Sequence, residues 1–395
     1  MSYSQIKTPR FYIDYIQYLN SMGVCAEPVV AEQDGTWNLQ SGDPQFMGKV
    51  WGITNYKSFA LTPEGINGDK TGGVIRKKFS MLNQSGGDFV PMYGLAQSLA
   101  ECNYIALFGH NFSSLGLTFK VLIKTYNVST GSDIYVEART LTPLYNCSIY
   151  GADNRYATAN SDGVCILGFD GFQLSNFNNI STTAVEFVIE PGDPSTGSWN
   201  DISGTPKISS ISMGRYFDMP SSPEFNSTQT KEYETRKHIT KGGKVLSKPK
   251  NIRRPRFGSF FNFDPSRSPI SRTGRKIWDI SFSHLASENI MGYNENSTPM
   301  FSESKGDYGS TQLNTNQDAF LYNLQDSGYL VDSNPDFFTN VIHLTQGRLP
   351  FIFQPDNTSF ETSDFNICTF DQDSFEHNQV ASSVYETSFQ IRETW

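Results

Sequence analysis

The chain has 395 residues and a formal net charge of −9, with 14% aromatic and 18% charged residues. The aromatic content excludes an intrinsically disordered chain, and the low charge excludes a coiled coil rich in Ala, Glu, Lys and Leu. Together with abundant Gly, Asn, Ser and Thr, this composition is typical of a mainly β protein with many loops. The length favours two or three domains.

The first element allows two interpretations. Pro9 fits the first turn of a helix and Gly23 fits the position after its last turn, with apolar residues at helical spacing between them. The same segment also alternates as a strand does, at Phe11, Ile13 and Tyr15. We therefore expect an N-terminal segment over residues 1–29 with a short helix, and a strand is the alternative.

Residues 30–220 are predicted to form a β-sandwich of the jelly-roll or discoidin-like kind. From about residue 36 the sequence consists of short apolar runs separated by turn residues such as Gly-Asp-Pro and Ser-Asp-Gly. The clearest runs cover residues 104–108, 117–126, 134–138, 165–169, 184–189 and 207–213. Many short strands without intervening helices favour an antiparallel sandwich.

Residues 221–275 have few periodic apolar positions and are strongly basic. The window from Lys231 to Lys276 holds 14 Lys and Arg against 3 acidic residues, a net charge of +11, so the remainder of the chain carries −20. We interpret 221–275 as an extended basic linker or arm that lies across acidic surfaces. Nucleic acid is an unlikely partner because the protein as a whole would repel phosphate.

A second β-rich domain is predicted over residues 276–395. Trp278, Ile280 and Phe282 alternate with polar residues, which indicates a strand. One helix is expected near 335–346, with Asn334 as its N-cap and Gly347 as its stop, followed by a buried strand over 349–353. The alternation from 385 onward predicts a last strand whose Trp395 docks into a sheet or a partner.

No motif in the sequence predicts catalysis, a cofactor or a metal site. The chain lacks HExxH, GxSxG, a Walker A loop and CxxC, and its five His and five Cys are scattered, so we expect buried free thiols. Asp371 and Asp373 begin like a calcium loop, yet they lack its Gly and its distal Glu, so we interpret them as a solvated turn. We therefore predict a protein that is not an enzyme.

Two residues are candidates for contact with a carbohydrate. Trp199 lies in the loop sequence Gly-Ser-Trp-Asn-Asp, where its ring could stack on a sugar. His110 directly follows an apolar strand, in a position where loops carry function. The alternatives are that Trp199 packs in a core or a subunit contact, and that His110 hydrogen-bonds within its own turn.

The centre of the basic segment combines arginines with phenylalanines. These candidate residues of an assembly arm are Arg253, Arg254, Arg256, Phe257, Phe260 and Phe261. Arg and aromatic residues dominate protein interfaces, and the acidic remainder of the chain offers a complementary surface. Binding to single-stranded nucleic acid uses the same mixture and is the less favoured alternative.

Three stretches together resemble a group of virion structural proteins of tailed bacteriophages, often of marine phages. They are YIALFGHNF at 104–112, ISMGRYFDMPSSP at 211–223 and LTQGRLPFIFQPD at 344–356, with IRETW at 391–395. The first stretch is also similar to the strand and turn of discoidin-like jelly rolls, and the part from residue 276 is similar to the sheet domains of distal-tail proteins. The resemblance implies a component of the tail, baseplate or fibre attachment, and it implies no catalytic residues.

We thus expect a virion protein, made in the host bacterial cytoplasm, that forms a homo-oligomeric ring and anchors neighbouring tail or fibre proteins. The alternatives are a receptor-binding module for host surface polysaccharide and a tail enzyme that degrades polysaccharide. No run of about 18 apolar residues exists, so no membrane span is predicted.

Overall fold

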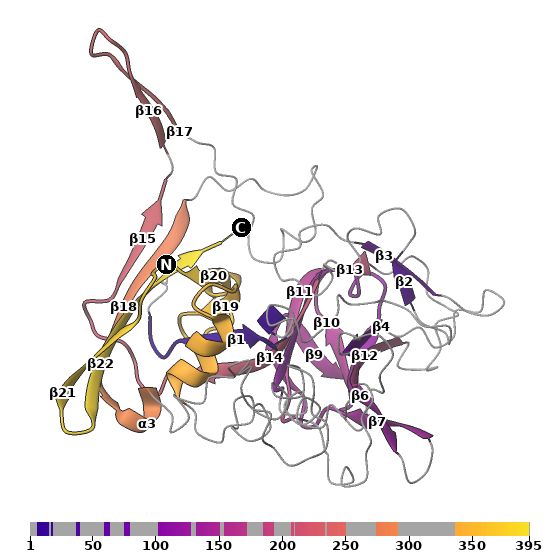
Figure 1. Ribbon diagram of the computed structural model, residues 1–395. Coiled ribbons are helices and arrows are strands. Elements are labelled where there is room, and N and C mark those ends of the chain that lie inside the picture. The colour runs from indigo at the N-terminus through magenta and orange to yellow at the C-terminus, as the bar shows by residue number, and fades with distance from the viewer. Residues whose placement is uncertain are drawn as a thin grey trace, which may run out of the picture.

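The structure is a computed structural model that describes fourteen parts of the chain. These are residues 6–15, 17–18, 37–39, 59–63, 75–79, 102–127, 132–150, 154–171, 185–192, 207–208, 210–233, 235–249, 274–290 and 336–394. The described part is mainly β, as predicted, and all of its strand pairs are antiparallel (Figure 1). The division into two domains at residues 221–275 stays a prediction.

An eleven-stranded sheet dominates the structure, in the order β15-β18-β22-β20-β19-β1-β14-β5-β11-β8, with β21 also paired to β22. Its members are β1 Arg10–Asp14, β5 Tyr104–His110, β8 Thr142–Tyr145, β11 Gly163–Gly168, β14 Ser210–Asp218, β15 Thr228–Glu232, β18 Arg275–Ala286, β19 Phe351–Gln354, β20 Asn366–Phe370, β21 Glu376–Ala381 and β22 Val384–Glu393. This one sheet takes strands from both predicted β domains, and β1 is the strand at which the two sets meet.

Three smaller sheets complete the fold. A six-stranded sheet contains β4 Ile75–Phe79, β6 Thr118–Asn127, β7 Ser132–Glu137, β9 Cys147–Tyr150, β10 Tyr156–Ala159 and β12 Val185–Gly192. A three-stranded sheet contains β2 Trp37–Leu39, β3 Phe59–Pro63 and β13 Lys207–Ile208, and a hairpin contains β16 Thr235–Ile239 and β17 Val245–Pro249. The short helical elements are α3 Ser287–Ile290, the π-helix η3 Phe338–His343 and the 3-10 helix η4 Thr362–Asp364.

For the first half of the N-terminal segment the strand alternative is confirmed, and the helix is wrong there. Residues 10–14 form strand β1, which pairs with β14 on one side and with β19 on the other. Helical geometry begins at Tyr15, where the side chain of Asp14 accepts a hydrogen bond from the backbone N–H of Gln17 at 3.2 Å. Both faces of β1 are buried, so its apolar residues satisfy the strand period and the helix period alike.

Buried side chains cover both faces of the large sheet around β1. Phe11 and Ile13 belong to one apolar cluster, whereas Tyr12 between them belongs to a second cluster. The same alternation occurs in β19, where Phe351 and Phe353 join the first cluster and Ile352 joins the second. The sheet is therefore an internal layer here, with a core on each side.

The helix predicted near 335–346 is present, with a π-helical centre. Asp336 Oδ1 accepts a hydrogen bond from the backbone N–H of Thr339 at 2.7 Å, so Asp336 does what was expected of Asn334. Asn334 itself lies outside the described residues. The helical stretch ends at Gly347, which has φ +62 as predicted for its stop residue.

The segment predicted as an extended arm contains regular structure. β15 is an edge strand of the large sheet and pairs with β18, and β16 and β17 form a hairpin of their own. The prediction missed these strands because their outer residues are polar or charged, so apolar residues do not alternate along them. Residues 251–273, with the arginines and phenylalanines of the candidate arm, lie outside the described residues.

Two further predictions are confirmed in the described residues. Cys102, Cys147, Cys165 and Cys368 are buried, and none of these four forms a disulfide. The last strand, β22, runs to Glu393 in the interior of the sheet, between β18 and β20. Cys25 and Trp395 lie outside the described residues, so the docking of Trp395 stays a prediction.

Gly214 tests how closely β1 and β14 approach each other. A Cβ atom at this position would lie 2.0 Å from the carbonyl oxygen of Ile13, which is part of the backbone and cannot rotate away. We expect Gly214→Ala to lower the free energy of unfolding by at least about 2 kcal/mol in urea denaturation. Gly242→Ala, where nothing lies within 4 Å, is the matched control. Equal stability of the two variants would contradict this packing.

Candidate functional site

The β16–β17 hairpin is the best candidate for a binding site. Its register pairs Lys237 with Ser247, His238 with Leu246 and Ile239 with Val245. A five-residue loop joins the strands, and Thr240 closes it with two hydrogen bonds. The N–H of Thr240 donates to the carbonyl of Lys244 at 3.0 Å, and the carbonyl of Thr240 accepts from the N–H of Gly243 at 2.9 Å. Gly243 has φ +79, which the left-handed position of this turn requires. The Gly-Gly pair in the loop therefore sets the hairpin.

The hairpin exposes apolar side chains on both of its faces. Ile239 is 67% exposed and its cross-strand neighbour Val245 is 57% exposed. Because side chains alternate along a strand, Leu246, at 49% exposure, lies on the opposite face beside His238. Isolated exposed apolar residues are common, but three of them on one two-stranded ribbon indicate a surface that binds a partner.

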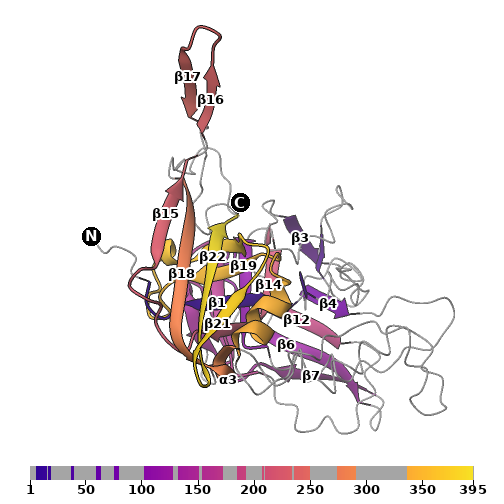
Figure 2. The same ribbon diagram turned by 60° about the vertical axis from the view of Figure 1, so that its left-hand side comes forward.

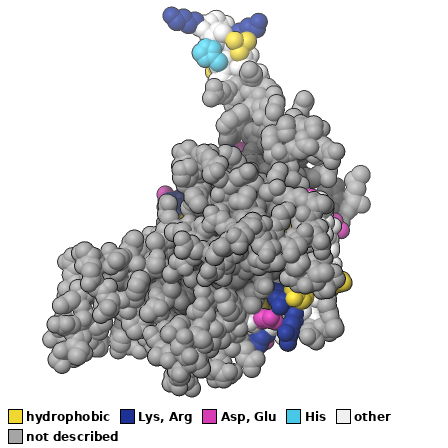
Figure 3. Space-filling view, turned by 90° about the vertical axis from the view of Figure 1, so that its right-hand side faces the viewer, with side chains coloured by type: hydrophobic (Ala, Val, Ile, Leu, Met, Phe, Trp, Pro, Cys, Tyr) yellow, Lys and Arg dark blue, Asp and Glu magenta, His cyan; other side chains and the backbone are white. Residues whose placement is uncertain are grey.

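All charged residues of the hairpin are basic. Residues 235–249 contain Arg236, Lys237, Lys241, Lys244 and Lys248 and no acidic residue. Lys237, Lys241 and Lys244 are exposed, and basic side chains lie beside apolar ones and a histidine on the hairpin at the top of the space-filling view (Figure 3). A complementary surface would combine acidic groups with exposed apolar side chains.

The hairpin stands away from the rest of the described protein. It continues upward from β15, and both ribbon views show it projecting beyond the sheets (Figures 1 and 2). In the strand pairing of the described residues, β16 and β17 pair only with each other. A surface on another molecule can therefore reach both faces of the hairpin.

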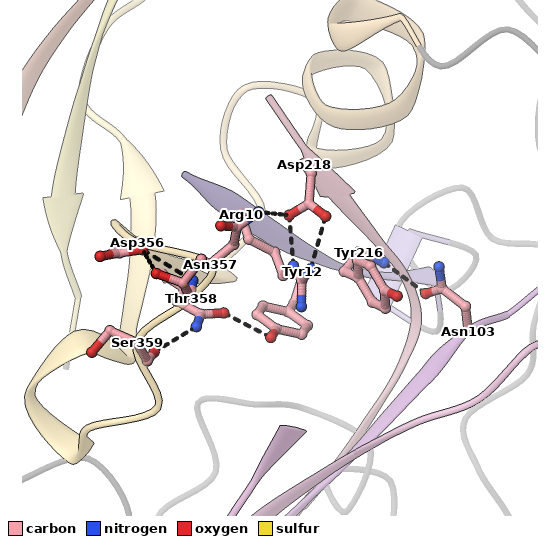
Figure 4. Close-up of polar contacts among 10 residues, drawn as sticks. Arg10, Tyr12, Asn103, Tyr216, Asp218, Asp356, Asn357, Thr358 and Ser359 are labelled. Atoms are coloured by element: carbon pink, nitrogen blue, oxygen red, sulfur yellow. Dashed lines mark hydrogen bonds and ion pairs between the residues drawn. The ribbon is translucent and has the colours of Figure 1, made fainter. Parts of the chain in front are cut away.

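A second polar cluster, where β1 meets β14 and β19, is satisfied from within. Arg10 donates to both carboxylate oxygens of Asp218, at 2.6 and 2.8 Å, and its guanidinium lies 4.2 Å from the ring centre of Tyr216 (Figure 4). The buried hydroxyl of Tyr12 donates to Gln354 at 2.8 Å. These contacts hold three strands together and direct the charged groups at each other, so we interpret the cluster as a structural joint.

Ser283, His284 and Glu224 bring a hydroxyl, an imidazole and a carboxylate together. Ser283 Oγ donates to Glu224, and His284 Nδ1 lies 2.8 Å from the same Oγ. Nucleophilic catalysis needs the imidazole between the hydroxyl and the carboxylate, whereas here the hydroxyl lies between the other two. His284 has φ +61 at a β-bulge in β18, which explains its position without a catalytic role.

His110 is the last residue of β5 and has no exposed surface. Its Nδ1 accepts a hydrogen bond from the backbone N–H of Phe112 at 3.3 Å, which confirms the alternative of a bond within its own turn. Its Nε2 has no hydrogen-bond partner. In this conformation the side chain of His110 is buried, and its contact with a carbohydrate stays a prediction.

The other predicted site residues are not brought together. Trp199, the arginines 253, 254 and 256, and the phenylalanines 257, 260 and 261 lie outside the described residues. Asp371 and Asp373 contact Arg392 and Arg348, respectively. Among the described residues no group of three or more His, Cys, Asp or Glu is placed to hold a metal ion. None of the helices described is long and apolar enough to cross a membrane.

Comparison with known proteins gives no match: no protein family, no curated protein and no solved structure is similar to this chain. The positive charge of the candidate site is evident in the sequence from the excess of Lys and Arg between Lys231 and Lys276. The hairpin itself was not predicted, although the Lys-Gly-Gly-Lys sequence at 241–244 is a turn signal that could have located it.

His110 gives a pH-dependent test of this packing. Burial lowers the pKa of His110 to about 4, from 6.5 in the unfolded chain. Above pH 6.5 the imidazole is neutral in the folded and the unfolded chain, so the free energy of unfolding keeps its full value. As the pH falls from 6.5 toward 4, the imidazole takes up a proton in the unfolded chain but not in the folded one, and the free energy of unfolding falls.

Between pH 7 and pH 4.5, we expect the free energy of unfolding to fall by about 2 kcal/mol less in His110→Asn than in the wild type, as measured by urea denaturation. The Asn amide oxygen can still accept the Phe112 N–H. His238→Asn, at the exposed hairpin histidine, is the control and should follow the wild type. Parallel pH profiles for the His110 variant and the wild type would contradict the prediction.

Proposed function

We propose that this chain is a non-enzymatic structural protein of a tailed-bacteriophage virion, in the region of the tail or baseplate. It assembles into a ring and anchors neighbouring tail or fibre proteins. The β16–β17 hairpin is the arm through which it grips an acidic surface of a neighbouring subunit.

The exposed, basic and apolar hairpin is the observation that supports this proposal. A two-stranded ribbon alone is only marginally stable in water, and one that exposes Ile239, Val245 and Leu246 gains stability when a partner covers these side chains. Its five cations find no acidic residue within the hairpin. An assembly arm accounts for both properties, because the neighbour supplies apolar contact and negative charge at the same time.

Placement in a phage virion rests on the resemblance of residues 104–112, 211–223 and 344–356 to tail-associated proteins. In the structure these stretches include β5, β14 and β19, which all belong to the large sheet. The ring rests on the physical rule that head-to-tail contacts between identical subunits close into rings when the rotation permits.

The two alternatives gain no support from the described residues. Contact with polysaccharide was assigned to Trp199 and His110, of which the first lies outside the described residues and the second is buried. A polysaccharide-degrading enzyme would need two facing carboxylates about 5–10 Å apart, and release of reducing sugar from host polysaccharide would reveal such an activity. A glycan array with the purified protein separates receptor binding from assembly.

The proposal predicts that loss of the hairpin removes assembly without unfolding the protein. We would replace residues 234–250 by a short Gly-Ser linker, which keeps β15 and β18 paired in the sheet. The circular dichroism spectrum and melting temperature should stay close to those of the wild type, while electron microscopy should show particles that lack the ring.

The control for this experiment is Lys237→Arg with Lys241→Arg and Lys244→Arg, which keeps every charge and should assemble normally. Particles of normal composition and shape from the hairpin-deleted protein would overturn the proposed function.

A further inference from the structure

We infer that the hairpin of one copy docks on the outer face of the β15–β18–β22–β21 part of the sheet in a second copy of this chain. This inference rests on the proposed function, since it names the partner of the same arm. We call the acceptor the acidic face and define it by Glu224, Asp279, Glu376 and Glu386.

The strand pattern places these carboxylates on one outward-facing surface. Trp278, Ile280 and Phe282 of β18 are buried, so Asp279 and its alternate neighbours Ser281 and Ser283 face away from the core. In β22, Thr387 and Phe389 are buried, so Glu386 faces outward as well. Glu376 of β21 pairs with Ser388 of β22, which lies two residues from Glu386 on the same face.

The loop before β15 lies against this surface. Glu224 N donates to the carbonyl of Ser281 at 2.8 Å, and Ser281 Oγ donates to Asn226 at 3.0 Å. Glu224 also accepts a hydrogen bond from Ser283 Oγ. The fourth carboxylate is thus held beside the outward-facing serines of β18.

The acidic face has no positive side chain of its own. The segments that form it, residues 219–230, 279–286 and 376–390, contain no Lys or Arg. Arg275 and Arg392 lie farther along the same strands, where Arg392 pairs with Glu232 and Asp371. None of these described segments supplies a Lys or Arg to the acidic face, and the hairpin, whose charged residues are all basic, can supply one from another copy.

Exposed apolar side chains accompany the acidic face, as they do the hairpin. Phe225, between Glu224 and Asn226, is fully exposed, and Val380 near the end of β21 is 51% exposed. Large apolar side chains at the centre of a charged surface are the usual composition of a protein interface. Ile239, Val245 and Leu246 of the hairpin offer the matching contacts.

The geometry requires that donor and acceptor belong to different copies. The hairpin extends beyond one end of the sheet, and the turn between β21 and β22 lies at the opposite end in both ribbon views (Figures 1 and 2). One copy therefore presents its hairpin beyond one end of the sheet, whereas its acidic face lies along the middle of β18 and β22 and extends toward the other end. Such a contact is head-to-tail, and its repetition gives a ring or a filament.

Reversal of charges tests the pairing directly. The hairpin variant carries Lys237→Glu and Lys241→Glu, and the face variant carries Glu376→Lys and Glu386→Lys. Sedimentation velocity measures self-association of each variant alone and of a 1:1 mixture. We expect each variant alone to associate at least tenfold more weakly than the wild type, because the hairpin variant lowers the net charge of the hairpin from +5 to +1 and the face variant changes that of the acidic face from −4 to 0.

The mixture should recover association between unlike copies, since the unchanged hairpin of the face variant meets the unchanged acidic face of the hairpin variant. The control variant carries Arg139→Glu and Arg155→Glu, at two exposed arginines outside both surfaces. It makes the same change in net charge as the hairpin variant and should assemble as the wild type does. Circular dichroism checks that every variant is folded.

The outcomes separate this inference from the proposed function. A hairpin variant that assembles normally overturns both. A weakened hairpin variant with a normal face variant, or a mixture that does not recover, overturns the acidic face as acceptor and leaves the arm in place. A wild-type protein that stays monomeric at every concentration overturns the second copy as partner, and the arm then serves a different acidic virion protein.

Discussion

Strand β1 is the element on which the described structure depends. It brings residues 10–14 between β14 and β19, and so forms hydrogen bonds with segments about 200 and 340 residues away in sequence. The ion pair of Arg10 with Asp218 and the hydrogen bond of Tyr12 with Gln354 fix its register on the two sides. Without β1 the sheet would present two edges instead of one continuous surface, and both cores would lose the side chains that lie on its two faces.

Local patterns predicted strands well where one face is buried and the other is solvated. Trp278, Ile280 and Phe282 in β18 are an example, and the alternation showed both the strand and its inner face. β1 was misread because its residues are buried on both faces, so alternation and helical spacing fit equally well. Strand order could not be predicted, since pairings such as Phe11 with Phe217 and Phe353 depend on tertiary packing and leave no local signal.

The sequence predicted the positive charge of the candidate site but not its hairpin structure. The excess of Lys and Arg in the window around the hairpin is visible in the sequence alone. The pairing of Ile239 with Val245 and of His238 with Leu246 is not, because these exposed strands lack the apolar alternation that a core imposes. The acidic face was missed for a related reason: Glu224, Asp279 and the pair Glu376 and Glu386 come from three separate segments, and only the sheet places them together.

The positions of β1 and β22 in the sheet have a consequence for synthesis of the protein. Both strands lie in its interior, yet one comes from residues 10–14 and the other from residues 384–393. During translation β1 waits for β14, which follows about 200 residues later, and for β19, which follows about 340 residues later, while β18 waits for β22, which emerges about a hundred residues after it. Unpaired strand edges persist for that time and invite pairing with other chains. Expression at low temperature, or with chaperones that shield such edges, should therefore favour correctly folded protein over inclusion bodies.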